Sequence, residues 1–94
     1  MSRLDDLKVL LESGELSTTK LADESGVVLD IDSLQVLALN ETGMFLVEAL
    51  REGAASKEEL TQRLTKEFDV DEEVAAQDVD SFLDEMEKLL LDKR

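Results

Sequence analysis

Acidic residues come nearest to forming a recognisable metal site in this sequence. Asp30, Asp32 and Glu41 fall at the first, third and twelfth positions of an EF-hand-like loop, where carboxylates bind calcium. The fifth and sixth positions of such a loop need an oxygen ligand and a glycine, but here they are Leu34 and Gln35. The loop fails as a calcium site, and we predict no metal site.

The amino-acid composition excludes catalytic sites that depend on cysteine or histidine. The chain has no cysteine and no histidine, which excludes disulfides, thiolate metal ligands and both Ser-His-Asp and Cys-His nucleophilic catalysis. The usual general base is missing together with histidine. Hydrolysis by either of these arrangements is therefore excluded, and we expect no cofactor.

One serine has a sequence context that suggests covalent modification. Asp32-Ser33-Leu34 is similar to the Asp-Ser-Leu of acyl carrier proteins, which are small, acidic and helical and accept phosphopantetheine on this serine. That serine should open a long amphipathic helix, whereas here Asn40 and Gly43 follow within ten residues. An acyl carrier-like protein modified with phosphopantetheine at Ser33 is nevertheless kept as an alternative hypothesis for the function of the chain.

The charge balance limits the partners of the chain. Its 94 residues fit one compact domain, and 24 Asp and Glu against 10 Lys and Arg give a net charge of -14. This charge repels nucleic-acid phosphates and anionic membranes alike. The sequence contains neither an apolar run of the ~18 residues needed to span a bilayer nor a signal peptide. We expect a cytoplasmic domain with neither nucleic acid nor membrane as partner.

The first secondary-structure element that the sequence predicts is a leucine-rich segment at the N-terminus. Residues 1–14 are predicted to form an N-terminal amphipathic helix, ended by Gly14, and residues 15–94 the main domain. The leucines at helical spacing are Leu4, Leu7, Leu10 and Leu11. Because the C-terminal end is leucine-rich as well, a homodimer is one expectation.

Helical periodicity is lost after this segment. Residues 16–24 suit a loop or a weak first strand, and residues 27–31 alternate with the period of two that is typical of a half-buried strand. A polar turn at 32–33 leads into a second apolar run at 34–39. This pattern predicts an antiparallel hairpin in a small sheet of two or three strands.

Three helices are predicted after the sheet. Asn40 or Thr42 caps the first, which ends at Gly53, and Ser56-Lys57-Glu58-Glu59 opens the second as a capping box. The third begins near Asp71. Its apolar stripe consists of Ala75, Val79, Phe82, Leu83, Met86, Leu89 and Leu90.

A sheet this small has exposed edges. The run 34–39 carries neither proline nor charge, so it lacks the usual protection of an edge strand. An extended peptide could pair with such an edge by strand addition. The run could equally be a central strand, or be covered by the N-terminal segment, and the residues alone leave both possibilities open.

An ordered set of motifs resembles a known family. The stretch 28–31, followed by Val36-Leu37-Ala38-Leu39-Asn40-Glu41-Thr42-Gly43, resembles the strand, strand and LNxTG sequence of PqqD-like proteins. The similarity continues through 52–53, 56–60 and 67–70 to the apolar third helix, covering about residues 27–91.

This resemblance implies an α+β, winged helix-turn-helix fold with three antiparallel strands followed by three helices, here with an extra N-terminal helix. It implies a peptide chaperone, or precursor-peptide recognition element, that binds the leader of a ribosomally made precursor. The leader would add as a strand beside the third strand, against the third helix. The domain would then present it to a modifying enzyme, in many cases a radical S-adenosylmethionine enzyme. Cofactor biosynthesis is one pathway of this kind. By this resemblance the chain itself would not be an enzyme.

The resemblance also places a peptide-binding groove between the second apolar run and the third helix. Most of the helix residues must belong to the core, so we expect only one or two of them to line the groove. The candidate peptide-binding residues are Leu34, Val36, Leu37, Ala38, Leu39, Asp78, Val79, Phe82, Leu83 and Met86.

Overall fold

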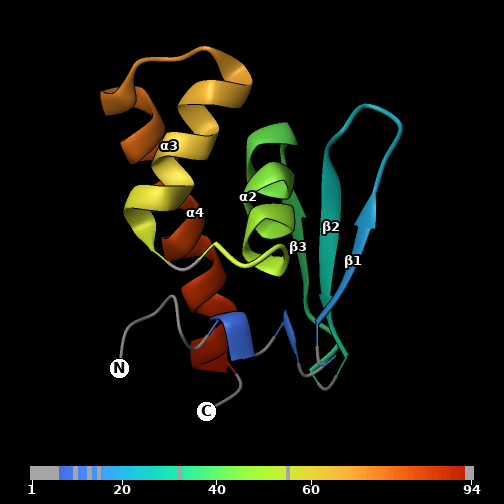
Figure 1. The fold of residues 1–94 in the computed structure, drawn as a ribbon. Coiled ribbons are helices and arrows are strands. Elements are labelled where there is room, and N and C mark those ends of the chain that lie inside the picture. Colours follow the sequence, from blue (N-terminus) through green and yellow to red (C-terminus); the bar gives the residue numbers. More distant parts are fainter. Residues whose placement is uncertain are drawn as a thin grey trace.

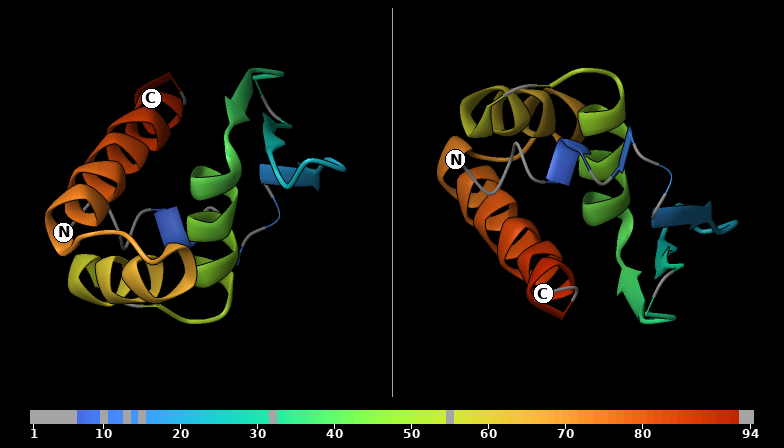
Figure 2. Two further views of the ribbon diagram at one scale, coloured as in Figure 1. Left: turned by 90° about the horizontal axis from the view of Figure 1, so that it is seen from above. Right: turned by 90° about the horizontal axis from the view of Figure 1, so that it is seen from below.

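The computed structural model describes residues 7–92 except residues 10, 13, 15, 32 and 55, and of residues 89–92 it describes the backbone alone. Its elements are, in chain order, β1 (Leu16–Lys20), β2 (Gly26–Asp30), β3 (Val36–Leu39), α2 (Glu41–Arg51), α3 (Lys57–Phe68) and α4 (Glu72–Asp92). The strands form one antiparallel sheet in the order β1-β2-β3, and the three helices lie on one side of it (Figures 1 and 2). The predicted α+β order of a small sheet and three helices is confirmed.

The N-terminal segment joins the core of the main domain. Residues 7–9, 11 and 12 are helical, and the side chains of Leu7 and Leu11 are buried in the same cluster as the helices and the sheet. The rest of the predicted helix, residues 1–6, 10 and 13, lies outside the described residues. The division of the chain into 1–14 and 15–94 stays a prediction.

The turn between β2 and β3 corrects the predicted extent of the second apolar run. Extended structure was expected from Leu34, but β3 begins at Val36. Leu34 has a left-handed backbone, with φ of 61°, and its N–H donates to the Asp30 carbonyl at 2.7 Å. The Asp30 N–H in turn donates to the Gln35 carbonyl at 2.8 Å. The hairpin closes through this conformation, which leaves the Leu34 side chain 73% exposed.

The helices cover one face of the sheet, and the other face is partly exposed to solvent. Cross-strand partners share a face, so the inner face carries Leu16, Val28 and Leu39, whose side chains are buried against the helices. The outer face carries Val27 and Leu29, which are half-buried, beside exposed residues of β3. The predicted alternation is present within β2, but the predicted end of the strand is wrong: Ile31 lies in the turn after β2 and is exposed.

Helix α2 occupies the centre of the fold. The Asn40 side chain caps it, accepting a hydrogen bond from the Gly43 N–H at 2.8 Å, as the sequence predicted. Helix α2 packs against β2 and β3 on one side and against α3 and α4 on the other, so it is apolar around most of its circumference. Its buried residues are Gly43, Met44, Leu46, Val47, Ala49 and Leu50.

Helices α3 and α4 complete the core as amphipathic elements. Ser56 caps α3 by accepting a hydrogen bond from the Glu59 N–H at 3.0 Å. Phe68, near its end, meets Phe45 of α2 edge-to-face with ring centroids 5.5 Å apart. The stripe predicted for α4 is buried at Ala75, Val79, Phe82, Leu83 and Met86. The side chains of Leu89 and Leu90 lie outside the described part.

An ion-pair cluster joins the β1–β2 hairpin to α2. The Lys20 ammonium lies 2.7 Å from a Glu24 carboxylate oxygen and 3.2 Å from one of Glu48. Hydrogen bonds donated to Glu24 and then to Glu48 raise the pKa of Lys20 above its usual value. Because all three side chains are exposed to solvent, these ion pairs add only a weak link between the hairpin and α2.

Gly26 marks the closest approach of β2 to its neighbours. A Cβ atom at this position would overlap the Thr19 carbonyl and lie 2.5 Å from the Met44 sulfur. We expect Gly26→Ala to lower the free energy of unfolding by about 2–3 kcal/mol, because β1 or α2 would have to shift. Urea denaturation followed by circular dichroism measures this loss. The control Ser17→Ala, at an exposed position, should change it by less than ~0.5 kcal/mol. Equal stability of the two variants would contradict the close approach.

Candidate functional site

Strand β3 forms an open edge of the sheet. The strand order places it beside β2 on one side, and no strand of the described residues pairs with its other side. Val36, Leu37, Ala38 and Leu39 include no charged residue and no proline, the features that usually protect an edge. The alternative of a central strand, which the sequence left open, is excluded for the described part of the chain.

The register shows which peptide groups of β3 face outward. In an antiparallel pair, residues that exchange hydrogen bonds alternate with residues that do not. The bond from Asp30 to Gln35 sets the phase, so Leu37, two residues on, directs its N–H and C=O toward Val28 of β2. Val36 and Ala38 therefore direct theirs away from the sheet. An added strand would pair with these two residues.

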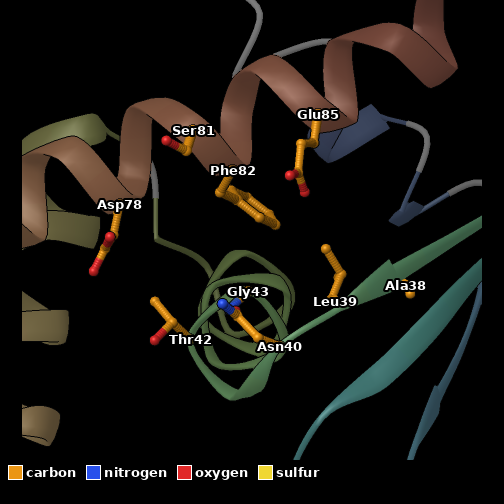
Figure 3. Close-up of a pocket in the computed structure, with 9 residues that line it drawn as sticks. All are labelled: Ala38, Leu39, Asn40, Thr42, Gly43, Asp78, Ser81, Phe82 and Glu85. Atoms are coloured by element: carbon orange, nitrogen blue, oxygen red, sulfur yellow. The ribbon is translucent and has the colours of Figure 1, made fainter.

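A pocket of about 290 Å³ lies between this edge, the start of α2 and one face of α4 (Figure 3). We call it the β3–α4 pocket. The residues that line it are Ala38, Leu39, Asn40, Thr42, Gly43, Asp78, Ser81, Phe82 and Glu85. The pocket combines an open strand edge with an apolar floor and a polar rim.

Local structure fixes the shape of this pocket. Asn40 lies between the last residue of β3 and the first of α2, so strand and helix meet without a linker. Gly43 lets Leu39 lie close to α2, since a Cβ atom there would be 3.1 Å from a Leu39 methyl carbon. Leu39 and Phe82 face each other across the pocket from β3 and α4 (Figure 3). Both are at least 95% buried, so the floor belongs to the core as well.

The structure brings together four of the predicted peptide-binding residues at this pocket: Ala38, Leu39, Asp78 and Phe82. Val36 and Leu37 lie on the same strand but outside the pocket lining. Val79, Leu83 and Met86 are core residues, buried on the neighbouring face of α4. Leu34 is a turn residue and not part of the strand. Of the four apolar α4 residues of the predicted site, only Phe82 lines this pocket.

Sequence reasoning left five lining residues out of the predicted site: Asn40, Thr42, Gly43, Ser81 and Glu85. The sequence spacing does place two of them, Ser81 and Glu85, on the same helix face as Asp78 and Phe82. Positions 78, 81, 82 and 85 are spaced by three, one and three residues, which places them on a single helix face. The face of α4 that lines the pocket is thus adjacent to the face that packs in the core.

The acidic positions of the calcium-like loop do not converge. Asp30 is fully buried on the inner face of the sheet, while Glu41 is exposed at the start of α2. Asp32 is outside the described residues. Within the described ranges, no group of three or more metal-ligating side chains is arranged to hold an ion. In the same part of the chain, no helix is long and apolar enough to cross a membrane.

Ser33 lies in the turn before β3, where its N–H approaches the Asp30 carboxylate at 3.4 Å. The next helix begins at Glu41, after the whole of β3. Ser33 therefore does not open a helix, as the serine of a carrier protein should.

A second pocket, of about 410 Å³, lies between α3 and α4. Its lining includes Lys57, Thr61 and Glu72, which are polar and of mixed charge. It borders no strand edge. The larger volume therefore does not make it the better site for an extended ligand.

Comparisons with known proteins agree with this fold. The sequence profile of the family described as coenzyme PQQ synthesis protein D (PqqD) matches residues 25–91. Among solved structures, one described as TbiB1 in complex with the TbiA(beta) leader peptide is similar, with a TM-score of 0.65 and 22% sequence identity. The likeness covers 85% of this chain and 86% of the other. Comparison with curated proteins gave no match.

Proposed function

The chain belongs to the PqqD family, and from this membership we propose that it binds the leader segment of a ribosomally made precursor peptide by strand addition to β3. The observation that carries the proposal is the open edge of β3 beside the β3–α4 pocket. The similar solved structure supports it, since the TbiB1 protein in that structure is in complex with a leader peptide.

The proposed ligand is an extended segment. Its backbone would exchange hydrogen bonds with the outward peptide groups of Val36 and Ala38, which gives affinity without a sequence requirement. Alternate side chains of an added strand point to one face, so every second ligand residue would enter the β3–α4 pocket. Leu39 and Phe82 would meet an apolar side chain there. Recognition of sequence would come from these pocket-facing positions.

The domain would do no chemistry on the peptide. Its pocket is lined by no lysine and no arginine, and the sequence has no cysteine or histidine to act as a nucleophile or base. Its role would be to hold the leader while a separate enzyme modifies the rest of the precursor. A radical S-adenosylmethionine enzyme is one such partner.

The carrier-protein alternative receives no support. A phosphopantetheinylated serine needs the start of a helix, and Ser33 precedes a strand. The family membership also points to peptide binding.

An NMR titration of the labelled domain tests strand addition residue by residue. On adding leader peptides encoded by neighbouring genes, the amide protons of Val36 and Ala38 should shift downfield and become protected from exchange, because they gain new acceptors. The Leu37 amide should change less, since its bond to β2 already exists. Amides of Asn40, Ser81 and Glu85 should shift with the pocket.

The alternation between neighbouring residues is the internal control of this titration. General tightening of the sheet would protect Val36, Leu37 and Ala38 equally, which would contradict pairing at the free edge. Shifts confined to Thr61, Gln62 and Ala76 would instead place the peptide in the pocket between α3 and α4.

A further inference from the structure

Two carboxylates flank the β3–α4 pocket on the α4 side. Asp78 and Glu85 both line it, and seven residues of helix separate them by about 10.5 Å. Figure 3 shows Glu85 toward Leu39 and Asp78 toward Thr42, with Phe82 between them. The pocket therefore has an apolar centre with an acidic group at each end.

Neither of these two carboxylates forms an ion pair with a cation of the described residues, and both border the pocket. Among the described residues, ion pairs are formed by Glu24, Glu48, Glu52, Glu59 and Asp80. The cations of the observed pairs, Lys20, Lys57 and Arg63, do not line the pocket.

The start of α2 also borders the pocket, and its partial positive charge would favour an anion. The Asn40 side chain already accepts from the Gly43 N–H, and Glu41 lies in the first turn. The positive end of the helix is thus compensated by its own residues. The two full charges of Asp78 and Glu85 dominate the rim.

We propose that the peptide bound beside β3 carries an apolar side chain flanked on both sides by basic ones. This inference rests on the proposed strand addition. Residues on one face of a strand repeat every 6.6–6.8 Å or so, and residues four apart lie about 13 Å apart. The span between residues two positions before and two positions after the apolar one is therefore similar to the ~10.5 Å of helix between Asp78 and Glu85, so that the long side chains of lysine or arginine at these positions could reach the two carboxylates. The apolar residue between them would contact Leu39 and Phe82.

The net charge of the whole chain also favours a basic peptide. A net charge of -14 attracts a cationic segment and repels an acidic one before contact. That field alone would accelerate the binding of any basic peptide. Only the local carboxylates can require basic residues at two defined positions.

Selection from a displayed library of random 12-residue peptides tests the inference even though the natural ligand is unidentified. We expect the enriched peptides to share a basic residue two positions before and two positions after an apolar one. One enriched peptide is then synthesised, and its affinity is measured by calorimetry for the wild type and two double variants.

The variants separate the local carboxylates from the overall charge. Asp78→Asn with Glu85→Gln should weaken the synthesised peptide about three- to tenfold, the effect of two exposed ion pairs. Glu67→Gln with Glu73→Gln makes the same change in net charge at two exposed positions that line neither pocket. This control should bind the peptide as the wild type does.

Each outcome has a distinct meaning. Enriched peptides without a basic pair, or equal loss in the two double variants, would overturn the inference while leaving strand addition in place. No enrichment over the background library, or binding that moves no β3 amide in the NMR titration, would overturn the proposed function as well.

Discussion

Replacing Ala38 by proline should weaken peptide binding at least about thirtyfold while the domain stays folded. The Ala38 N–H faces away from β2, so its removal breaks no bond of the sheet, and proline is tolerated at such a position of an edge strand. The bound peptide would lose the hydrogen bond from the N–H of residue 38, and the peptide carbonyl that accepts this bond would be left unpaired. We expect a loss of at least about 2 kcal/mol in binding free energy, or roughly thirtyfold in affinity. Calorimetric titration with the peptide selected on the wild type measures this loss.

The opposite edge of the sheet offers a matched control. By the same alternation, Thr18 of β1 directs its N–H away from β2. Thr18→Pro therefore makes the same backbone change at an edge that borders neither of the two described pockets, and it should leave peptide affinity unchanged. Circular dichroism and urea denaturation establish that both variants fold. A folded Ala38→Pro domain with wild-type affinity would contradict strand addition at β3.

Replacing Phe82 by alanine should give the largest loss of stability among the pocket residues. The ring is 4% exposed and belongs to the core cluster while forming the pocket floor. We expect the free energy of unfolding to fall by about 3–5 kcal/mol, because the deletion removes apolar contacts and leaves a cavity. A domain of this size has about 5–14 kcal/mol in total. The loss should appear as a lower urea midpoint at an unchanged slope.

The neighbouring position serves as the control for this substitution. Ser81 lines the same pocket but is exposed, so Ser81→Ala should change stability by less than about 0.5 kcal/mol. If Phe82→Ala lost no more than this control, the ring would not be part of the core. Phe82→Leu should lose less than alanine, and it provides a more stable variant in which to measure the contribution of the ring to peptide affinity.

The elements of the fold were predictable because their signals are local. Ser56 was expected as a helix cap, and Asn40 as one of two candidates with Thr42, from residue type and position alone; Asn40 and Ser56 both accept the capping hydrogen bonds. The hairpin followed from alternation around a short turn. Leu34 was placed in the strand because an apolar side chain gives no indication of a left-handed backbone, which the turn geometry imposes.

The site was predictable only in part because it depends on tertiary contacts. Whether β3 is an edge is set by the order in which strands pair, and no feature of residues 34–39 encodes that order. The family resemblance placed the groove against the apolar face of α4, so the predicted site included Val79, Leu83 and Met86, which the structure buries in the core. The pocket lies on the adjacent face, whose polar residues resemble ordinary solvent-exposed positions in sequence.

The direct junction of β3 and α2 at Asn40 has a consequence for the thermodynamics of recognition. The last strand residue and the first helical residue are separated by Asn40 alone, and its side chain is bonded to Gly43. The edge is therefore anchored in the core before any ligand arrives. Binding to such a rigid template requires little ordering of the protein, so the entropic cost falls mainly on the incoming chain. A leader that is already extended in solution would bind more tightly than a flexible one of the same sequence pattern.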